Sequence, residues 1–424
     1  MPPRRNDQYL RWERAIDRYA GAPLIQALAL LKHSDPRREA IEASEIRRIL
    51  AIKLHGIGNV VLLLPLIRRL KKHFQGAEID FLTLWTNKGL FEAVDEIRKT
   101  HYVDASAVHH LVSSTVRVLP CLRKRSYDLV IDFEQFAYFS ALLSLLACRG
   151  TRVGFLNPAH LRHLAYTIPV TYSETEHMAG IFERLVRAVG AEGPQGSGRI
   201  TLRRSHEDEA LAFLDASGIR SGDAVVVLHP GSSPNLTLRR WPPERFARLG
   251  DRLAEQLGMK IVVSGGREEE ELVRSVIDYM TAPAVNGAGQ LSLLGFAALC
   301  GHCELLVGND TGPIQIATSM GTPAVGLYGP NTPFLYGPLG PDSISVYNQT
   351  TCSPCLRNVN RKISRCTHAR CLEAIGVDQV FSQIKNKYFD WDGDLIIRFK
   401  KQRISGTYED AQNDTKIMAT ASQP

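Results

Sequence analysis

Long apolar runs and a secretory signal are both missing from this sequence. Although 44% of its 424 residues are hydrophobic, no apolar run reaches the length of a membrane span. Residues 1–38 carry charges throughout, so they lack the basic, apolar and small-residue pattern of a signal peptide. Without such a signal, the eight cysteines are expected to be reduced thiols. These absences predict a cytoplasmic protein.

A dinucleotide-binding fingerprint is also incomplete. Gly56 and Gly58 follow an apolar stretch and Asp80 follows them, but Val61 occupies the position of the third glycine. A side chain at that position would crowd the packing of the helix against the strand. The sequence therefore argues against an oxidoreductase with a bound dinucleotide.

Acidic residues are outnumbered by basic ones. The 51 Lys and Arg against 44 Asp and Glu give a formal net charge of +7. This excess favours an anionic partner, such as a phosphate-bearing lipid, a membrane surface, a nucleotide or a nucleic acid. The length suits two domains with cores of ordinary size.

The stretch at residues 307–315 has the clearest local pattern. Glu304 to Val307 is expected to be a buried strand, and apolar residues recur at helical spacing after Pro313. A strand, a polar turn and a helix start present free backbone N–H groups, which bind phosphate readily. An ordinary turn capped by Asp310 or Thr311 fits the same pattern. Both interpretations remain open from this stretch alone.

Strands and helices alternate along two long segments. Residues 49–54, 77–82 and 127–132 are predicted strands in the first segment, with helices near 60–74, 89–99 and 112–125. Strands at 224–228, 260–264 and 322–328 alternate with helices in the second. This alternation predicts two parallel sheets covered on both faces.

Composition divides the chain into five parts. We expect a basic helical extension at 1–45, a first lobe at 46–190, a Gly- and Pro-rich linker at 191–221, a second lobe at 222–392 and a polar, disordered tail at 393–424. Within the extension, the apolar stretch 23–32 is flanked by arginines. It is expected either to lie at a membrane interface or to pack on the first lobe.

Several motifs occur in an order that resembles one known family. They are Lys53 to Gly58 with Pro65, residues 128–132, residues 152–155, His229 to Ser232 with Arg240-Trp241-Pro242, and Gly308 to Pro313. Together they resemble glycosyltransferase family 9, which contains the ADP-heptose:lipopolysaccharide heptosyltransferases. The resemblance spans about Ile49 to Val380. It implies the GT-B fold, in which two Rossmann-like lobes with parallel sheets face a central cleft.

The resemblance places a nucleotide-sugar donor on the second lobe. The donor-binding residues that it implies are Asp310, Thr311, Gly312, Ser232, Ser233, Arg239 and either Glu268 or Glu269. Arg239 replaces the lysine that the family has two residues before the tryptophan, which exchanges a point charge for a flat fork. Gln315 replaces a frequent histidine, and an amide there can still bind a phosphate or a sugar hydroxyl.

The first lobe departs from the family at one catalytic position. Asn59 lies where the heptosyltransferases have the aspartate thought to act as base, and a neutral amide is not basic at pH 7. Two other residues could take the acceptor's proton. His55 lies in the same turn, and Glu134 follows a strand whose carboxyl end reaches the same sheet edge. Glu134 is slightly favoured because it is again a carboxylate.

The predicted function follows from this resemblance. It is inverting transfer of a sugar, ADP-linked heptose being the first choice, onto a lipopolysaccharide core or surface polysaccharide. We expect no resident cofactor, no divalent metal and no nucleic-acid partner, with the inner membrane as an optional peripheral contact. A catalytically silent nucleotide-sugar or glycan-binding protein, and an epimerase or hydrolase, are the alternatives.

Four cysteines near the end of the second lobe need a separate interpretation. Cys352, Cys355, Cys366 and Cys371 have a spacing near that of a structural zinc site. Such cysteines also occur in the resembling family without a clear metal role, so zinc is the less favoured interpretation.

Overall fold

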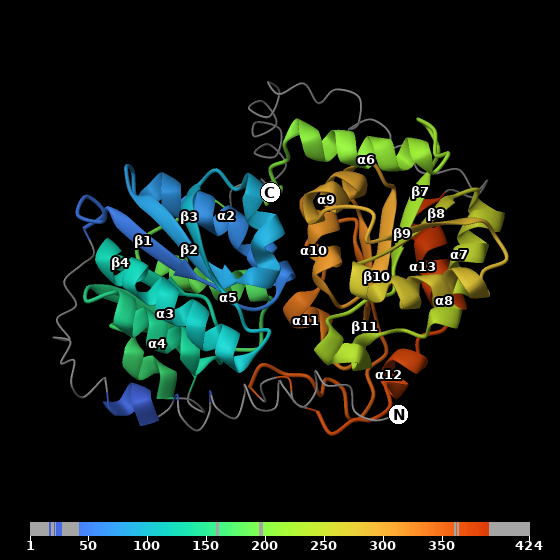
Figure 1. Ribbon diagram of the computed structural model, residues 1–424. Coiled ribbons are helices and arrows are strands. Elements are labelled where there is room, and N and C mark those ends of the chain that lie inside the picture. Colours follow the sequence, from blue (N-terminus) through green and yellow to red (C-terminus); the bar gives the residue numbers. More distant parts are fainter. Residues whose placement is uncertain are drawn as a thin grey trace, which may run out of the picture.

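Two parallel sheets form the framework of the protein (Figure 1). The computed structural model describes residues 17, 21, 23–27, 42–157, 161–194, 198–359, 362 and 364–389, without the side chains of 234–236. Each sheet has six strands, and each belongs to a separate lobe. This confirms the predicted α/β fold of two Rossmann-like lobes. The predicted tail and most of the predicted extension lie outside the described residues.

The first lobe contains the sheet with strand order β3-β2-β1-β4-β5-β6. Its strands are β1 (Arg48–Ile52), β2 (Glu78–Leu84), β3 (Ile97–Val103), β4 (Leu129–Asp132), β5 (Thr151–Leu156) and β6 (Ile168–Thr171). Its helices are α2 (Ile57–His73), η1 (Trp85–Ala93), α3 (Val108–Arg125), α4 (Tyr138–Ala147), η2 (Leu161–Ala165) and α5 (Met178–Arg187).

The second lobe contains the sheet with strand order β12-β11-β10-β7-β8-β9. Its strands are β7 (Val225–His229), β8 (Lys260–Gly265), β9 (Ala284–Ala288), β10 (Leu305–Asn309), β11 (Ala324–Tyr328) and β12 (Ile344–Tyr347). Its helices are α6 (Arg204–Ala216), η3 (Pro234–Arg239), α7 (Pro243–Leu257), η4 (Arg267–Glu269), α8 (Glu270–Tyr279), α9 (Leu293–Gly301), α10 (Gly312–Ser319), α11 (Pro333–Tyr336), α12 (Arg370–Glu373) and α13 (Val377–Tyr388).

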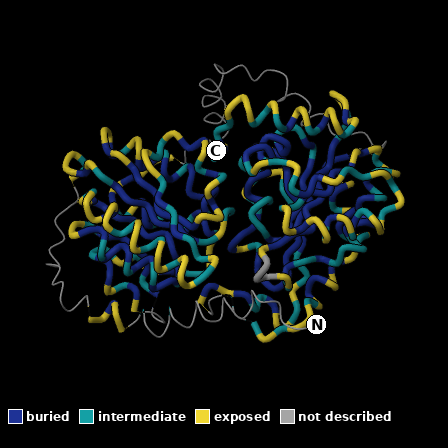
Figure 2. Tube along the Cα trace, in the orientation of Figure 1, coloured by how far each residue is buried: buried dark blue, intermediate teal, exposed yellow. Residues whose placement is uncertain are grey.

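Side-chain alternation along the strands explains the layered cores. In β1, Ile49 and Ala51 join the apolar cluster that includes α2 and α5, whereas Leu50 and Ile52 join the cluster that includes α3 and α4. Both faces of the strand are therefore buried, as a parallel sheet requires. The buried interiors of both lobes are visible in Figure 2.

Two predicted segments differ from the structure. Residues 89–99 were expected to be helical, but the 3₁₀ helix η1 ends at Ala93 and β3 begins at Ile97. Charged residues interrupt the alternation of apolar and polar side chains in β3, an edge strand. The period of two that is typical of a strand therefore cannot be recognised in the sequence. The predicted linker 191–221 also contains a helix, α6, which packs against α9.

The described part of the N-terminal segment packs on the first lobe. Asp17 accepts hydrogen bonds from the backbone N–H groups of Tyr138 and Phe139 at the start of α4. Ile25 is fully buried in the cluster formed with α4. Within the predicted apolar stretch, Ile25 therefore packs on the lobe, whereas residues 23, 24, 26 and 27 are exposed. Across the described ranges, no helix has both the length and the apolar character of a membrane span.

The two lobes touch at the starts of α2 and α10. A Cβ on Gly312 would lie 2.2 Å from Cγ2 of Ile57, and one on Gly58 would lie 3.1 Å from Cα of Gly312. Only glycines permit this approach, which would otherwise force the two backbones apart. The carboxyl edges of both sheets therefore meet around these two turns.

Candidate active site

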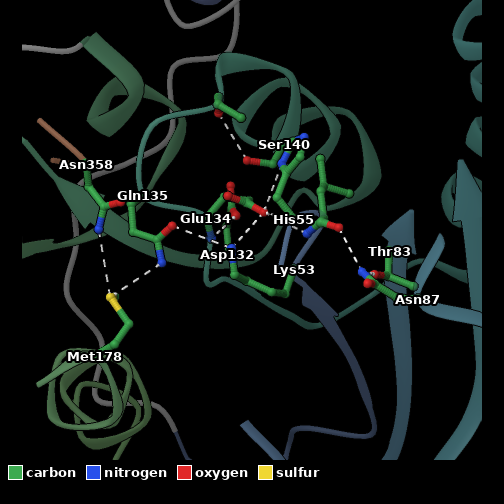
Figure 3. A network of polar contacts seen from close by, with 12 residues as sticks. Lys53, His55, Thr83, Asn87, Asp132, Glu134, Gln135, Ser140, Met178 and Asn358 are labelled. Atoms are coloured by element: carbon green, nitrogen blue, oxygen red, sulfur yellow. Dashed lines mark hydrogen bonds and ion pairs between the residues drawn. The ribbon is translucent and has the colours of Figure 1, made fainter. Parts of the chain in front are cut away.

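A buried ion pair lies at the carboxyl edge of the first sheet. Nζ of Lys53, just after β1, donates to Oε1 of Glu134 at 2.8 Å, and both side chains are at most 1% exposed. The same oxygen accepts from the backbone N–H groups of Leu54 and His55, at 2.8 and 2.7 Å (Figure 3). Glu134 therefore fixes the shape of the turn that leads into α2.

Burial by itself would raise the pKa of Glu134. The charge of Lys53 and the hydrogen bond with His55 oppose this effect and hold that pKa well below its ordinary value. A carboxylate with a low pKa is a weak base, and this one has no exposed surface. The geometry thus suits a positioning group better than a group that meets an acceptor.

His55 lies between this pair and the solvent. Its Nδ1 is 3.4 Å from Oε1 of Glu134, and its side chain is 43% exposed. The expected proximity of His55 and Glu134 is therefore confirmed. Asn59 lies in the first turn of α2 and is partly exposed. The preceding Gly56 has φ 84°, and a Cβ there would be 3.1 Å from Nδ2 of Asn59.

A second polar cluster supports Glu134 from behind. Nη1 of Arg162 donates to the carbonyl of Glu134 at 2.7 Å, and its Nη2 donates to Asp132 at 3.0 Å. Tyr166 donates to the same Asp132 oxygen at 2.7 Å. Arg162 is 1% exposed. The sequence did not suggest a role for Arg162, and it placed Lys53 in a motif without a partner, although a lysine at the end of an apolar strand is a signal for a buried partner.

The second sheet has its own ion pair at the corresponding edge. Nη1 of Arg239 donates to the carbonyl of Asp310 at 2.7 Å and to its Oδ2 at 3.1 Å. Nδ2 of Asn331 donates to the same carboxylate oxygen at 2.8 Å. Thus Arg239 and Asp310, both predicted donor ligands, lie together at the start of α10, and Asn331 is an addition that the sequence did not suggest.

The start of α10 has no side-chain cap. Thr311 is its N-cap residue, but its hydroxyl donates back to the carbonyl of Asn309 at 3.2 Å. The alternative of a turn closed by an Asp310 or Thr311 cap therefore does not apply. Helix α2 likewise starts without a side-chain cap. Two helix N-termini, each with a positive dipole end, meet at the contact between the lobes.

The other predicted donor residues divide into buried and exposed ones. Ser232 is buried, and its hydroxyl accepts from Nε of Arg240 at 3.1 Å, whereas Ser233 is exposed. Glu269 is buried and accepts from the backbone of Ser232 and Gly266, at 2.9 and 3.1 Å. Glu268 is exposed, so of the two glutamates it is the one whose carboxylate faces solvent.

Gln315 makes contacts within the second lobe. Its Nε2 donates to the carbonyls of Tyr336 and Gly337, at 3.0 and 3.2 Å. Its Oε1 is buried and has no hydrogen-bond partner among the described residues. The amide therefore holds the end of α11 against α10, and its oxygen is directed away from those two bonds.

The cysteine-rich loop crosses to the first lobe. It runs between β12 and α12, beneath α11 in Figure 1. Nδ2 of Asn358 donates to the hydroxyl of Tyr172 at 2.7 Å, and Arg357 pairs with Glu174 at 2.9 Å. Figure 3 shows Asn358 beside Met178, and Met178 also contacts Gln135, whose amide oxygen lies 3.5 Å from Nζ of Lys53.

Cys352, Cys355 and Cys366 of this loop and Cys371 of α12 form no disulfide among the described residues. The described residues contain no group of three or more His, Cys, Asp or Glu placed to hold a metal ion. Sγ of Cys366 instead donates to the carbonyl of His368 at 2.6 Å. The spacing of the cysteines thus does not translate into a tetrahedral site in this structure.

Known proteins resemble this chain over most of its length. Lipopolysaccharide heptosyltransferase 3 of Escherichia coli K12 is 24% identical over 282 residues, which cover 64% of this chain and 79% of the relative. The structure of a family 9 glycosyl transferase from Veillonella parvula DSM 2008 matches with a TM-score of 0.67 at 24% identity, over 82% of this chain and 99% of that one.

A ligand-bound structure has the same fold. Escherichia coli heptosyltransferase WaaC with ADP-2-deoxy-2-fluoro heptose matches with a TM-score of 0.59 at 19% identity, over 80% of this chain and 99% of that one. The model of glycosyltransferase family 9 (heptosyltransferase) matches residues 116–364, which is more than half of the sequence. The chain therefore belongs to glycosyltransferase family 9, the heptosyltransferase family.

Proposed function

We propose that this protein transfers heptose from ADP-heptose to a lipopolysaccharide core acceptor, with inversion at the sugar carbon. The observation that carries the proposal is the meeting of two uncapped helix N-termini, those of α2 and α10, beside Arg239. Backbone N–H groups and helix dipoles there favour a diphosphate. The names of the relatives support ADP-heptose as donor and lipopolysaccharide as acceptor.

The second lobe would hold the donor. Arg239 uses Nη1 on Asp310, and the rest of its guanidinium carries further donors that could bind phosphate oxygens. Because Gly312 packs against Ile57 in this structure, the diphosphate would reach the start of α10 when the lobes move apart. Glu268 is the exposed carboxylate available for a ribose hydroxyl.

The first lobe would supply the base. A single inverting displacement requires a group that takes the proton of the attacking hydroxyl. His55 fits this role, because it is exposed and has Glu134 at its Nδ1 side. Glu134 would orient the ring and stabilise its protonated form, as the carboxylate does in other carboxylate–histidine pairs. Asn59 would orient the acceptor hydroxyl through its amide.

No resident cofactor or divalent metal is part of this proposal. Arg239 and the two helix N-termini would stabilise the charge that develops on the ADP leaving group. The acceptor carries a lipid, so the enzyme would work from the cytoplasm at the inner face of the inner membrane. Its net positive charge of +7 suits such an anionic surface.

A coupled assay tests the proposal directly. Purified protein, ADP-heptose and heptose-deficient lipopolysaccharide should release ADP only when all three are present, with EDTA making no difference. His55→Ala should lower turnover about a hundred- to ten-thousandfold while ADP still binds. Binding of ADP-heptose without any transfer would favour the silent binding protein, and loss of ADP binding in EDTA would exclude the metal-free mechanism.

A further inference from the structure

Lys362 has an unusual backbone conformation in the cysteine-rich loop. Its φ is 56°, in the left-handed region that disfavours residues with a Cβ. Its N–H donates to the carbonyl of Arg357 at 2.8 Å, which closes the loop. Glycine would adopt this conformation without steric cost, so a lysine here suggests that its side chain has a use. Strained residues of this kind cluster at functional sites.

The side chain of Lys362 is held over a fixed aromatic ring. Its Nζ lies 4.4 Å from the centroid of Tyr336. The carbonyl of Tyr336 is bound by Gln315 in α10, and its hydroxyl is bound to Asn358. Tyr336 is thus held through its backbone by a residue of α10 and through its ring hydroxyl by Asn358, so the ring under the Lys362 amine has a fixed position.

Both ion pairs influence the pKa of the Lys362 amine. Their charged groups are Arg239 at the end of η3, Asp310 after β10, Lys53 after β1 and Glu134 after β4. Each ion pair is internally balanced, at 3.1 and 2.8 Å. Lys362 adds a further amine near these two pairs, and no carboxylate within the described ranges lies at ion-pair distance from it. Protonation of this amine would therefore add one net positive charge.

Lys362 is partly buried, and its desolvation together with the nearby charge of Arg239 lowers its pKa to about 7. The lowered pKa means that the amine loses part of its positive charge near neutral pH. An anion bound beside it would favour the protonated form and raise its pKa again. Binding of the anion would consequently be accompanied by uptake of a proton.

We propose that Lys362 is a direct ligand of the donor diphosphate and takes up a proton when the diphosphate binds. This proposal rests on the proposed function, because it assigns a further binding residue to the same donor site. Arg239 would bind the diphosphate from the sheet edge, and Lys362 would bind it from the cysteine-rich loop. The loop would thereby contact the donor as well as join the two lobes.

Titration calorimetry with ADP, in buffers of different ionisation enthalpy between pH 7.5 and 9, tests the proposal. Wild type should take up a proton on binding, and its Kd should rise by up to about tenfold for each pH unit. Lys362→Met should raise Kd about ten- to hundredfold at pH 7.5 and abolish the proton uptake. Lys362→Arg should restore affinity without pH dependence, because arginine stays charged.

A matched control separates binding from structure. Lys385→Met removes an exposed lysine on α13, and it should leave both Kd and proton uptake unchanged. If Lys362 only packed on Tyr336, Lys362→Met would lower the melting temperature but keep the wild-type Kd, and the proposal would be overturned. Lys362→Gly should keep the melting temperature, because glycine adopts a positive φ without steric cost, while the affinity for ADP falls.

Failure of this inference differs from failure of the proposed function. Equal ADP affinity and proton uptake in wild type and Lys362→Met would overturn the inference and leave heptosyl transfer intact. Pyrophosphate or UDP that binds with Lys362 dependence, while ADP does not, would support the inference and change the donor. A wild type that binds none of the three diphosphates would overturn both.

Discussion

Each lobe has an ion pair at the carboxyl edge of its sheet, and the two pairs differ in their surroundings. In the first lobe, the Lys53 and Glu134 side chains are 1% and 0% exposed. In the second, those of Arg239 and Asp310 are 10% and 8% exposed. The distances are similar, 2.8 and 3.1 Å, so distance alone does not distinguish the two pairs.

The difference lies in which groups each pair is hydrogen-bonded to. One oxygen of Glu134 accepts from Lys53 and from two backbone N–H groups of the turn before α2. That pair is therefore part of the backbone architecture. Arg239 has five N–H donors, and both of its hydrogen bonds to Asp310 use Nη1. The first pair thus shapes the site, whereas the second has the chemistry to bind a ligand.

Removal of Glu134 should have the largest effect. Glu134→Ala leaves the charge of Lys53 buried without its partner, which typically costs about 3 to 5 kcal/mol of unfolding free energy. Urea denaturation measures this loss. The exposed Glu268→Ala is the matched control, and it should stay within about 0.5 kcal/mol of wild type.

A double variant separates the two contributions of Glu134 to stability, which are its charge pairing with Lys53 and its hydrogen bonds from the backbone. Lys53→Met with Glu134→Gln removes both charges and keeps an amide oxygen for the backbone N–H groups of Leu54 and His55. It should recover much of the lost stability, because replacing both members of a buried pair is often neutral. A loss below about 1 kcal/mol in Glu134→Ala would contradict the structural role of the first pair.

Removal of Arg239 should affect binding more than stability. Arg239→Ala deletes charge-assisted hydrogen bonds of about 1.5 to 3 kcal/mol, so the Kd for ADP should rise about ten- to hundredfold. Asp310 keeps its bond from Asn331, so the unfolding free energy should fall less than in Glu134→Ala. Calorimetry and urea denaturation on the same samples give both numbers. Unchanged ADP affinity would show that the two pairs are both structural.

Most of the fold could be predicted because its signals are local. The apolar strands, the glycine turns and the amphipathic helices recur along the chain, and the strand, turn and helix at 304–319 was recognised from one stretch. Strand β3 was missed because its charged residues break the expected alternation. Helix α6 was missed because the Gly- and Pro-rich residues before it dominated the interpretation of the whole linker.

The site was predictable only where sheet geometry brings residues together. Glu134 and His55 follow strands that are neighbours, so their proximity could be inferred from the carboxyl-edge rule. Lys362 and Asn331 come from loops whose paths no periodicity specifies. The sequence also left open whether Glu268 or Glu269 binds the donor. In the structure Glu269 faces the loop at Ser232 and Glu268 faces solvent, and no periodicity in so short a helix could predict this.

The smallest expected effect concerns Asn59. It lies at the position where the family resemblance leads us to expect an aspartate. If His55 is the base, then Asn59→Asp adds a second carboxylate near a turn that already has one, and turnover should change by only a few-fold. An acidic side chain in the first turn of α2 should add about 0.3 to 1 kcal/mol of stability through the helix dipole. Steady-state turnover and urea denaturation measure the two changes. A gain of a hundredfold or more in turnover would mean that the native chain lacks an efficient base, and that His55 does not fill that role.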